Sequence, residues 1–228
     1  ASLNSDIASV NTTGLVTALS TGETKIIASS EDGNYTDTCV VVIEKMKYTD
    51  GVFFVNEDWF GHNNSTINFL DKDENWHYRV YQKENPGKEL GCTSQYGTIY
   101  GDKLFIVSKQ NQDPGASTQG SRLAVVNAET MESLAEFASI GGADGRSFLG
   151  VDENKGYIST SNGIYIFDMN DLSIGNQVKG TENTTGSLYS GQIGTMIRTA
   201  DKVFAVNQQK GVMVIDTKAD SILTVIQA

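Results

Sequence analysis

Short runs of alternating apolar and polar residues, ended by Asp, Asn or Gly, recur along the chain from about residue 49 onward. One hairpin with an Asp or Asn at its turn is repeated four times: INFLDKDENWHYRV at 67–80, LAVVNAETMESLAEF at 123–137, IYIFDMNDLSIGNQV at 164–178 and VMVIDTKADSILTVI at 212–226. A period of two residues is typical of β-strands. The pattern therefore predicts four antiparallel strand pairs.

A second apolar strand precedes each hairpin, and its aromatic residues also align. They are Phe53, Phe105, Tyr157 and Phe204, separated by 52, 52 and 47 residues. A four-stranded sheet cannot bury both faces until neighbouring sheets stack on it, so a period of this size in short strands is typical of β-propeller blades. The fold class predicted is all-β, a partial or small β-propeller of about four blades.

Each repeat is expected to contain four strands, A to D, with A innermost. Strand B is predicted at 52–56, 104–108, 157–160 and 203–207, strand A at 94–100, 147–151 and 193–198, and strands C and D form the hairpins. The first repeat has no evident strand A, and the chain stops where a fifth blade would begin. We therefore expect four hairpins with three complete blades, as a fragment at both ends or as a smaller closed propeller.

Residues 128–139 offer an alternative, because AETMESLAEFAS contains good helix formers and reads in isolation as an amphipathic helix. Its equivalents in the other repeats carry β-branched or turn residues. The repeat therefore favours a strand here.

Residues 1–46 differ from the rest and predict a small β module with turns at Gly14 and at 32–34. The segments 7–10, 14–18, 26–28 and 40–42, with Gly22, resemble the second half of a group 2 bacterial immunoglobulin-like domain. Such domains normally have two further strands before this point, so Ala1 is not expected to be a native terminus. The resemblance implies a spacer or adhesive module on the outside of a bacterial cell. The domains predicted are 1–46, the C-terminal half of the immunoglobulin-like module, and 47–228, the propeller blades.

The later repeats resemble the YVTN-type propellers of bacterial surface-layer and related surface proteins. Segments 53–56, 105–108, 157–160 and 204–207 stand where that family has Tyr-Val-Thr-Asn, and its Asp at the end of strand C is matched by Asp71, Asn127, Asp168 and Asp216. The opening at 51–57 is similar to a subgroup of gut-bacterial surface lipoproteins, some of which capture cobalamin. This resemblance implies outer-membrane anchoring, a small-molecule or glycan ligand, and an outer-membrane transporter as a partner. The family usually has seven blades.

The charge narrows the choice of partners. The net charge of −11 would repel a phosphate backbone, which excludes nucleic acid as an expected partner. No apolar run approaches the roughly 20 residues of a membrane span. Cys39 and Cys92 fall in different predicted domains, so we expect two inert buried thiols rather than a disulfide.

Few residues offer catalytic chemistry. DKDEN at 71–75 is similar to the start of a calcium loop, but it lacks the glycine at position six and has Gln82 at position twelve, so a turn capped by Asp71 is favoured. His77 is expected in an outer strand, whereas His62 lies in a loop beside Glu57 and Asp58, where a metal or general-base role is an alternative. No nucleophile elbow, Walker loop, dinucleotide fingerprint or paired-Cys metal motif occurs. We predict no catalytic residue, no metal ligand and no cofactor.

The connecting loops are expected to meet on one face of the blades. The B–C loops are 57–64, 109–121, 161–162 and 207–211, and the D–A loops are about 84–93, 139–146 and 181–192. The ligand-binding residues predicted on this face are Trp59, Phe60, His62, Lys109, Gln110, Gln112, Arg146, Tyr189, Gln192, Asn207, Gln208 and Lys210. Aromatic rings bordered by amides suit a sugar or a corrinoid such as cobalamin. The alternative is that Trp59 and Phe60 pack between blades and that 109–121 is a mobile surface loop.

The function expected is that of a non-catalytic bacterial cell-surface protein that binds a ligand or partner through the loop face. One alternative is a propeller lyase or hydrolase with a metal or His62 at the same face. Another is an adhesive or spacer protein without a pocket.

Overall fold

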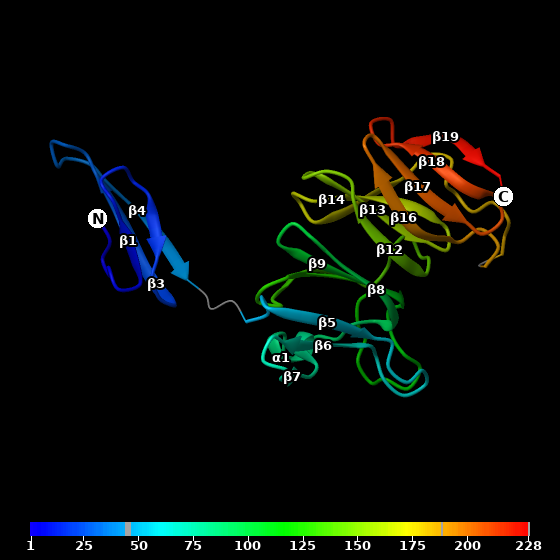
Figure 1. The fold of residues 1–228 in the computed structure, drawn as a ribbon, viewed down its shortest axis with the longest axis horizontal. Helices are drawn as coiled ribbons and strands as arrows, with labels where there is room; N and C mark the ends of the chain where they lie inside the picture. Colours follow the sequence, from blue (N-terminus) through cyan, green and yellow to red (C-terminus); the bar gives the residue numbers. More distant parts are fainter. Residues whose placement is uncertain (44–46, 188, 228) are drawn as a thin grey trace. The chain divides into compact units, whose positions relative to one another are not determined.

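The computed structural model of the chain describes residues 1–43, 47–187 and 189–227 (Figure 1). The chain divides into two compact units, Ala1–Lys47 and Tyr48–Ala228. The first unit holds two antiparallel strand pairs, β1 (Ala8–Val10) with β2 (Val16–Ala18) and β3 (Gly22–Ser29) with β4 (Thr36–Ile43). Gly14 and Gly33 have φ angles of 88° and 72°, so both turns predicted in this unit are confirmed.

The second unit consists of antiparallel sheets that follow one another in chain order (Figure 1). Sheet 1 contains β5 (Gly51–Asn56), β6 (Thr66–Asp71) and β7 (Trp76–His77). Sheet 2 contains β8 (Cys92–Tyr100), β9 (Lys103–Gln110), β10 (Leu123–Asn127) and β11 (Ser133–Phe137). Sheet 3 contains β12 (Gly145–Gly150), β13 (Lys155–Thr160), β14 (Gly163–Asp168) and β15 (Ser173–Gln177). Sheet 4 contains β16 (Ile193–Thr199), β17 (Lys202–Asn207), β18 (Gly211–Asp216) and β19 (Ser221–Ile226).

This arrangement confirms the predicted fold class, an all-β propeller-type stack; among the described residues, three blades have four strands and the first blade has no inner strand. The strand predicted within 128–139 is also confirmed, because β11 forms there and pairs antiparallel with β10. The helical reading of that segment is wrong. Pairing in register with the repeat has outweighed local helix propensity.

Three hydrophobic cores join successive sheets. The first lies between sheets 1 and 2 and includes Phe69 and Ile106, the second lies between sheets 2 and 3, and the third lies between sheets 3 and 4 and includes Tyr157 and Met213. Strand β9 contributes to two of these cores, because Ile106 faces sheet 1 whereas Phe105 faces sheet 3. Its apolar residues are therefore continuous rather than alternating, as in strands buried on both faces.

The four aligned aromatic residues occupy one structural position. Phe53, Phe105, Tyr157 and Phe204 are each the third residue of a B strand. Each lies opposite the C-strand residue two positions before the turn Asp or Asn. The first three pack towards the following sheet, and Phe105 stacks on Phe148 with ring centres 3.7 Å apart and planes 4° from parallel. The predicted equivalence is confirmed.

Sheet 1 departs from the prediction at its outer edge. Strand β7 has only two residues, and a short helix α1 (Val80–Glu84) follows where the hairpin was expected to continue. Val80 and Tyr81 are fully buried in the first core, and the Tyr81 hydroxyl donates a hydrogen bond to Glu136 of β11. The helix thus packs between sheets 1 and 2. A local pattern of alternating residues could not predict this helix, because its contacts are with a different repeat.

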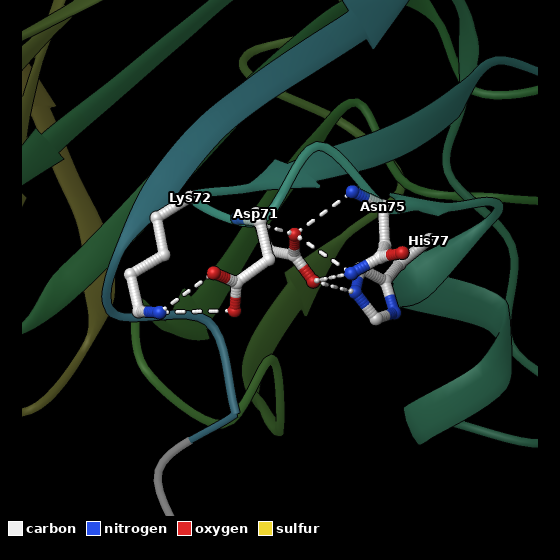
Figure 2. A network of polar contacts seen from close by, with 5 residues as sticks. Asp71, Lys72, Asn75 and His77 are labelled. Carbon is white, nitrogen blue, oxygen red and sulfur yellow. Dashed lines mark hydrogen bonds and ion pairs between the residues drawn. The ribbon is translucent and has the colours of Figure 1, made fainter.

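The C–D turns are capped by their Asp or Asn, as predicted. Figure 2 shows the Asp71 carboxylate, which accepts the backbone N–H groups of Asp73 at 3.0 Å and Asn75 at 2.9 Å and lies 2.8 Å from His77 Nε2. The equivalent oxygens of Asn127, Asp168 and Asp216 each accept two backbone N–H groups. The turn reading of DKDEN is therefore confirmed in the geometry of all four repeats.

Each turn also holds one non-glycine residue in the left-handed region of φ just before strand D. These are Glu74, Met131, Leu172 and Asp220, with φ angles of 63°, 63°, 48° and 47°. Such a conformation costs roughly 1–2 kcal/mol for an L-residue. The repeated strain accompanies the register shifts that the structure records between β10 and β11, β14 and β15, and β18 and β19.

The cysteines are unpaired, as expected. Cys92 is buried, and this burial raises the pKa of its thiol. The expectation that both thiols are buried is wrong for Cys39, which is exposed in a strand, β4, that pairs with β3 alone among the residues that the structure describes. Among the described residues, no helix is long and apolar enough to cross a membrane.

Phe105→Ala is expected to lower the free energy of unfolding by about 3–5 kcal/mol, because it leaves a cavity in the core between sheets 2 and 3. Phe60→Ala is the matched control, since Phe60 is 60% exposed and its loss should change stability by less than about 0.5 kcal/mol. Urea denaturation measures both changes. Equal effects of the two substitutions would contradict the assigned packing.

The Asp71 turn is expected to weaken in acid. The hydrogen bond from His77, followed by that from the Asn75 N–H, lowers the pKa of Asp71 from 3.8 to about 2. A lowered folded-state pKa stabilises the protein fully above about pH 4, and that contribution is lost as the pH falls towards 2. Denaturation from pH 5 to pH 2 should therefore show a steeper loss for the wild type than for Asp71→Asn. Parallel profiles would contradict the assignment.

Candidate functional site

The loops between strands B and C and between strands D and A form the candidate site. The four B–C connections are residues 57–65, 111–122, 161–162 and 208–210. The D–A connections are 78–91, 138–144 and 178–192. Lys109, Gln110, Arg146 and Asn207 lie at strand ends beside these loops, and the other predicted ligand-binding residues lie within them.

A buried carboxylate ties the first two B–C loops together. Asp113 is 1% exposed and accepts the backbone N–H of Gly61 at 2.8 Å and that of Gly115 at 2.7 Å. Asn64 reinforces the contact, because its Oδ1 accepts the Asp113 N–H and its Nδ2 donates to the carbonyl of Thr118, both at 2.8 Å. The loop at 111–122 is therefore hydrogen-bonded to its neighbour rather than free on the surface.

The electrostatics of Asp113 follow from these bonds. Burial disfavours its charge, but the N–H groups of Gly115 and Gly61, the Cys92 thiol and the nearby His62 together hold its pKa below the ordinary value. Gly115 is required by the close approach of the loops, since a Cβ there would lie 2.1 Å from the Gly61 carbonyl oxygen. We call this arrangement the Asp113 clamp.

The clamp holds an exposed aromatic group on the first loop. Trp59 is 69% exposed and Phe60 is 60% exposed, so neither packs between sheets. The Trp59 and His62 rings lie 3.8 Å apart between centres at an angle of 38°. An exposed flat ring therefore lies on a loop whose backbone is fixed by a buried hydrogen bond.

A polar hollow of about 200 Å³ is lined by His62, whose ring lies beside that of Trp59. Arg79 and Glu89 also line it, with a nitrogen–oxygen distance of 3.8 Å between them. The lining residues are His62, Asn63, Asn64, Arg79, Glu89, Gly115, Ala116, Ser117 and Thr118. The hollow thus offers a cation, a carboxylate, amides and hydroxyls within one small volume.

Two pairs of the remaining predicted residues meet in the part of the loop face that belongs to sheets 2 to 4. Lys109 Nζ lies 5.9 Å from the centre of the exposed Tyr189 ring, within reach of a cation–π contact. Gln192 donates its amide to Gln208. Arg146 is 15% exposed, and its nearest guanidinium nitrogen lies 3.9 Å from Asp144.

Sheet 4 carries a larger hollow of about 590 Å³, lined by Val206, Asn207, Gln208, Gln209, Lys210, Gly211, Val212, Val225 and Gln227. Asn207 is 3% exposed, donates to the Gly191 carbonyl, and accepts the backbone N–H groups of Gln209 and Lys210. Its side chain therefore holds the turn. Gln112 similarly donates to the Ala116 carbonyl at 2.8 Å.

The structure brings some predicted residues together and adds others. Trp59, Phe60 and His62 share one loop, Lys109 meets Tyr189, and Gln192 meets Gln208. Sequence reasoning missed Asp113, Arg79 and Glu89. The Asp-Pro-Gly at 113–115 signals a turn, but its pairing with Gly61 is a long-range contact that no local pattern carries. In the described part of the chain, no group of three or more His, Cys, Asp or Glu side chains is placed to hold a metal ion.

The stacked antiparallel sheets and the loop face define a β-propeller-type repeat protein. The chain belongs to the family described as Domain of unknown function (DUF5074), which matches residues 50–228. Residues 1–41 match the bacterial Ig-like domain (group 2) family, in agreement with the resemblance of that segment. No curated protein sequence is significantly similar to the chain.

Several solved structures are similar to the chain at low identity, and the first of those below, with a TM-score above 0.5, shares its fold. The extracellular domain of BT3049 from B. thetaiotaomicron is 17% identical with a TM-score of 0.52, over 89% of this chain and 21% of that one. Saccharomyces cerevisiae Sqt1 is 13% identical with a TM-score of 0.49, over 90% and 56%. BamB from Moraxella catarrhalis is 13% identical with a TM-score of 0.44, over 71% and 43%. The chain thus spans 21–56% of the length of these structures.

Asp113→Ala is expected to release the two clamped loops. The Gly61 and Gly115 N–H groups lose their buried acceptor, which costs about 1–3 kcal/mol and should accelerate their hydrogen exchange by about 5- to 150-fold. Asp73→Ala is the control, since the Asp73 side chain is 68% exposed. Unchanged exchange at Gly61 and Gly115 in the first variant would contradict the clamp.

Proposed function

We propose that the protein is a non-catalytic bacterial cell-surface protein whose loop face binds a glycan. The observation that carries this proposal is the exposed Trp59–Phe60 pair on a loop fixed by the Asp113 clamp. An aromatic ring held in place before binding offers stacking area to a sugar ring at a small cost in conformational entropy.

The polar hollow lined by His62, the ring neighbour of Trp59, supports a polar ligand of modest size. Its volume of about 200 Å³ is below the roughly 300–1,000 Å³ of pockets that enclose drug-sized ligands. Arg79, Glu89 and Asn63 can exchange hydrogen bonds with sugar hydroxyls. A single sugar ring stacked on Trp59 with its hydroxyls in the hollow fits these groups better than a corrinoid does. A corrinoid such as cobalamin would require the hollow of about 590 Å³ at sheet 4.

The surface location rests on the first unit and on the fold. Residues 1–41 match the bacterial Ig-like domain, which supports a module that extends from a cell. The BT3049 domain of similar fold is described as extracellular. The likeness of residues 51–57 to surface lipoproteins supports anchoring at the outer membrane and an outer-membrane transporter as a partner.

Trp59→Ala is expected to weaken glycan binding at least tenfold, or about 1.4 kcal/mol, because it removes the stacking surface. The experiment screens a glycan array and then measures affinity for the selected glycan by calorimetry, with free cobalamin as a parallel ligand. Trp76→Ala is the matched control, because Trp76 is the other tryptophan and lies in β7, outside the loops.

The outcomes separate the ligand classes. Loss of glycan binding in Trp59→Ala with normal binding in Trp76→Ala supports the proposal. Binding of cobalamin alone would replace the glycan by a corrinoid. No binding of any ligand at millimolar concentration, or equal losses in the two variants, would overturn the proposed site.

A further inference from the structure

A second hollow follows the polar hollow of the candidate site along the same two segments of chain. Its volume is about 290 Å³, and its lining residues are Gly87, Lys88, Glu89, Gln119, Gly120, Ser121, Glu136 and Ala138. Glu89 lines both hollows. The other segment is also shared, because residues 115–118 line the first hollow and residues 119–121 line the second. The two hollows therefore form one groove, and we call them the Arg79 hollow and the Lys88 hollow.

Both segments that line the groove are fixed by backbone contacts. Leu90, next to Glu89, is fully buried and forms a parallel bridge with Ser121. This close approach requires Gly120, since a Cβ there would lie 1.9 Å from the Leu90 carbonyl oxygen. The Gly120 N–H also donates to the Asn111 carbonyl at 2.8 Å. The groove is therefore formed before a ligand binds, which lowers the entropic cost of binding.

Helix α1 holds one carboxylate in each hollow. Gln82 Nε2 donates a hydrogen bond to Glu89 Oε2 at 2.9 Å, and the Tyr81 hydroxyl donates one to Glu136 Oε1. Glu89 comes from the connection that follows the helix, whereas Glu136 comes from β11 of sheet 2. Two neighbouring residues of one helix thus orient two carboxylates that are far apart in the sequence.

The second oxygen of each carboxylate lies near a cation. Glu89 Oε1 is 3.8 Å from a guanidinium nitrogen of Arg79, and Glu136 Oε2 is 3.3 Å from Lys88 Nζ. Each hollow therefore holds a hydrogen-bond donor beside an acceptor, with no net charge from the pair. Such a pair suits neighbouring sugar hydroxyls, because one hydroxyl can accept from the cation while the next donates to the carboxylate. The exposed amide of Gln119 adds a further donor and acceptor to the Lys88 hollow.

We propose that the two hollows are adjacent subsites for a neutral oligosaccharide of at least two sugar rings. This inference rests on the proposed glycan function: one ring stacks on Trp59 with its hydroxyls in the Arg79 hollow, and the next ring places its hydroxyls in the Lys88 hollow. Two similar polar pairs in succession fit a ligand whose hydroxyl groups repeat. The net charge of −11 disfavours acidic glycans, and neither ion pair offers an excess positive charge to offset that repulsion.

The experiment measures the affinity of the full chain for sugars of one and two rings by calorimetry. The neutral probes are glucose, mannose, xylose and N-acetylglucosamine, each alone and as its β1,4-linked dimer, with maltose as the α1,4-linked dimer of glucose. Glucuronic acid and sialic acid are the acidic probes. We expect the dimer of at least one neutral sugar to bind about tenfold more tightly than the single sugar, because only the dimer reaches both hollows.

Gln119→Ala tests the Lys88 hollow directly. Gln119 is exposed, so its replacement should leave the fold unchanged. We expect the affinity for the dimer to fall by about 2- to 12-fold, as for the loss of one hydrogen bond, while the affinity for the single sugar stays the same. Gln209→Ala is the matched control, because Gln209 is an exposed glutamine in the B–C turn of sheet 4. The side-chain amide NMR signals of Gln119, identified by their absence in the variant, should shift with the dimer and not with the single sugar.

The outcomes separate this inference from the proposed function. Binding of a single sugar that depends on Trp59 and equals the binding of its dimer would overturn the second subsite and leave the proposed function intact. Tighter binding of an acidic probe than of every neutral probe would overturn the neutral class. Equal losses in Gln119→Ala and Gln209→Ala would overturn the location of the subsite. No binding of any probe at millimolar concentration would overturn both the subsite and the proposed function.

Discussion

The faces of the sheets in the second unit have to be covered by neighbouring sheets, and this requirement governs most of the structure. β9 shows it most clearly, since Ile106 packs towards sheet 1 while Phe105 stacks on Phe148 of sheet 3. A single four-stranded sheet with two apolar faces has no stable isolated form in water, so the repeats are stable only in a stack. The loop face is a by-product of that stacking, because every B–C and D–A connection must leave its sheet at an end of the strands.

The sequence predicted the elements that repeat and missed those that occur once. The B strands and the capped turns at Asp71, Asn127, Asp168 and Asp216 recur with fixed spacing, and their hydrogen bonds are local, so both could be read from residue types. Helix α1 occurs in one repeat only and is held by tertiary contacts of Tyr81, which no pattern of alternation contains. The left-handed residues before each D strand were missed because none of the four is a glycine.

In the candidate site, too, the sequence predicted the local features and missed the long-range contacts. The exposed aromatic residues were identified from loop position and residue type, since Trp59 and Phe60 stand in a polar segment between two strands. Their fixed position depends on Asp113, which is 52 residues from Gly61 in the sequence. Bonds between loops of different repeats depend on how the sheets stack, so they become visible only when the fold is known. The role of Asn207 also becomes visible only in the fold: it was predicted to bind a ligand, but its amide bonds the backbone of its own turn and of Gly191.

Because the second unit has three separate cores, its stability is approximately the sum of the contributions of single sheets and of the interfaces between neighbouring sheets. In the part of the chain that the structure describes, sheets 2 and 3 each adjoin two cores, whereas sheets 1 and 4 adjoin one, so we expect local opening to cost the least free energy in sheets 1 and 4. The Trp59 loop belongs to sheet 1, so the hydrogen bonds of the Asp113 clamp stabilise sheet 1 against local unfolding. The clamp couples sheet 1 to sheet 2, whose two faces are both buried. A ligand that binds the Trp59 loop would therefore stabilise sheet 1 against local unfolding more than it stabilises sheets 2 and 3.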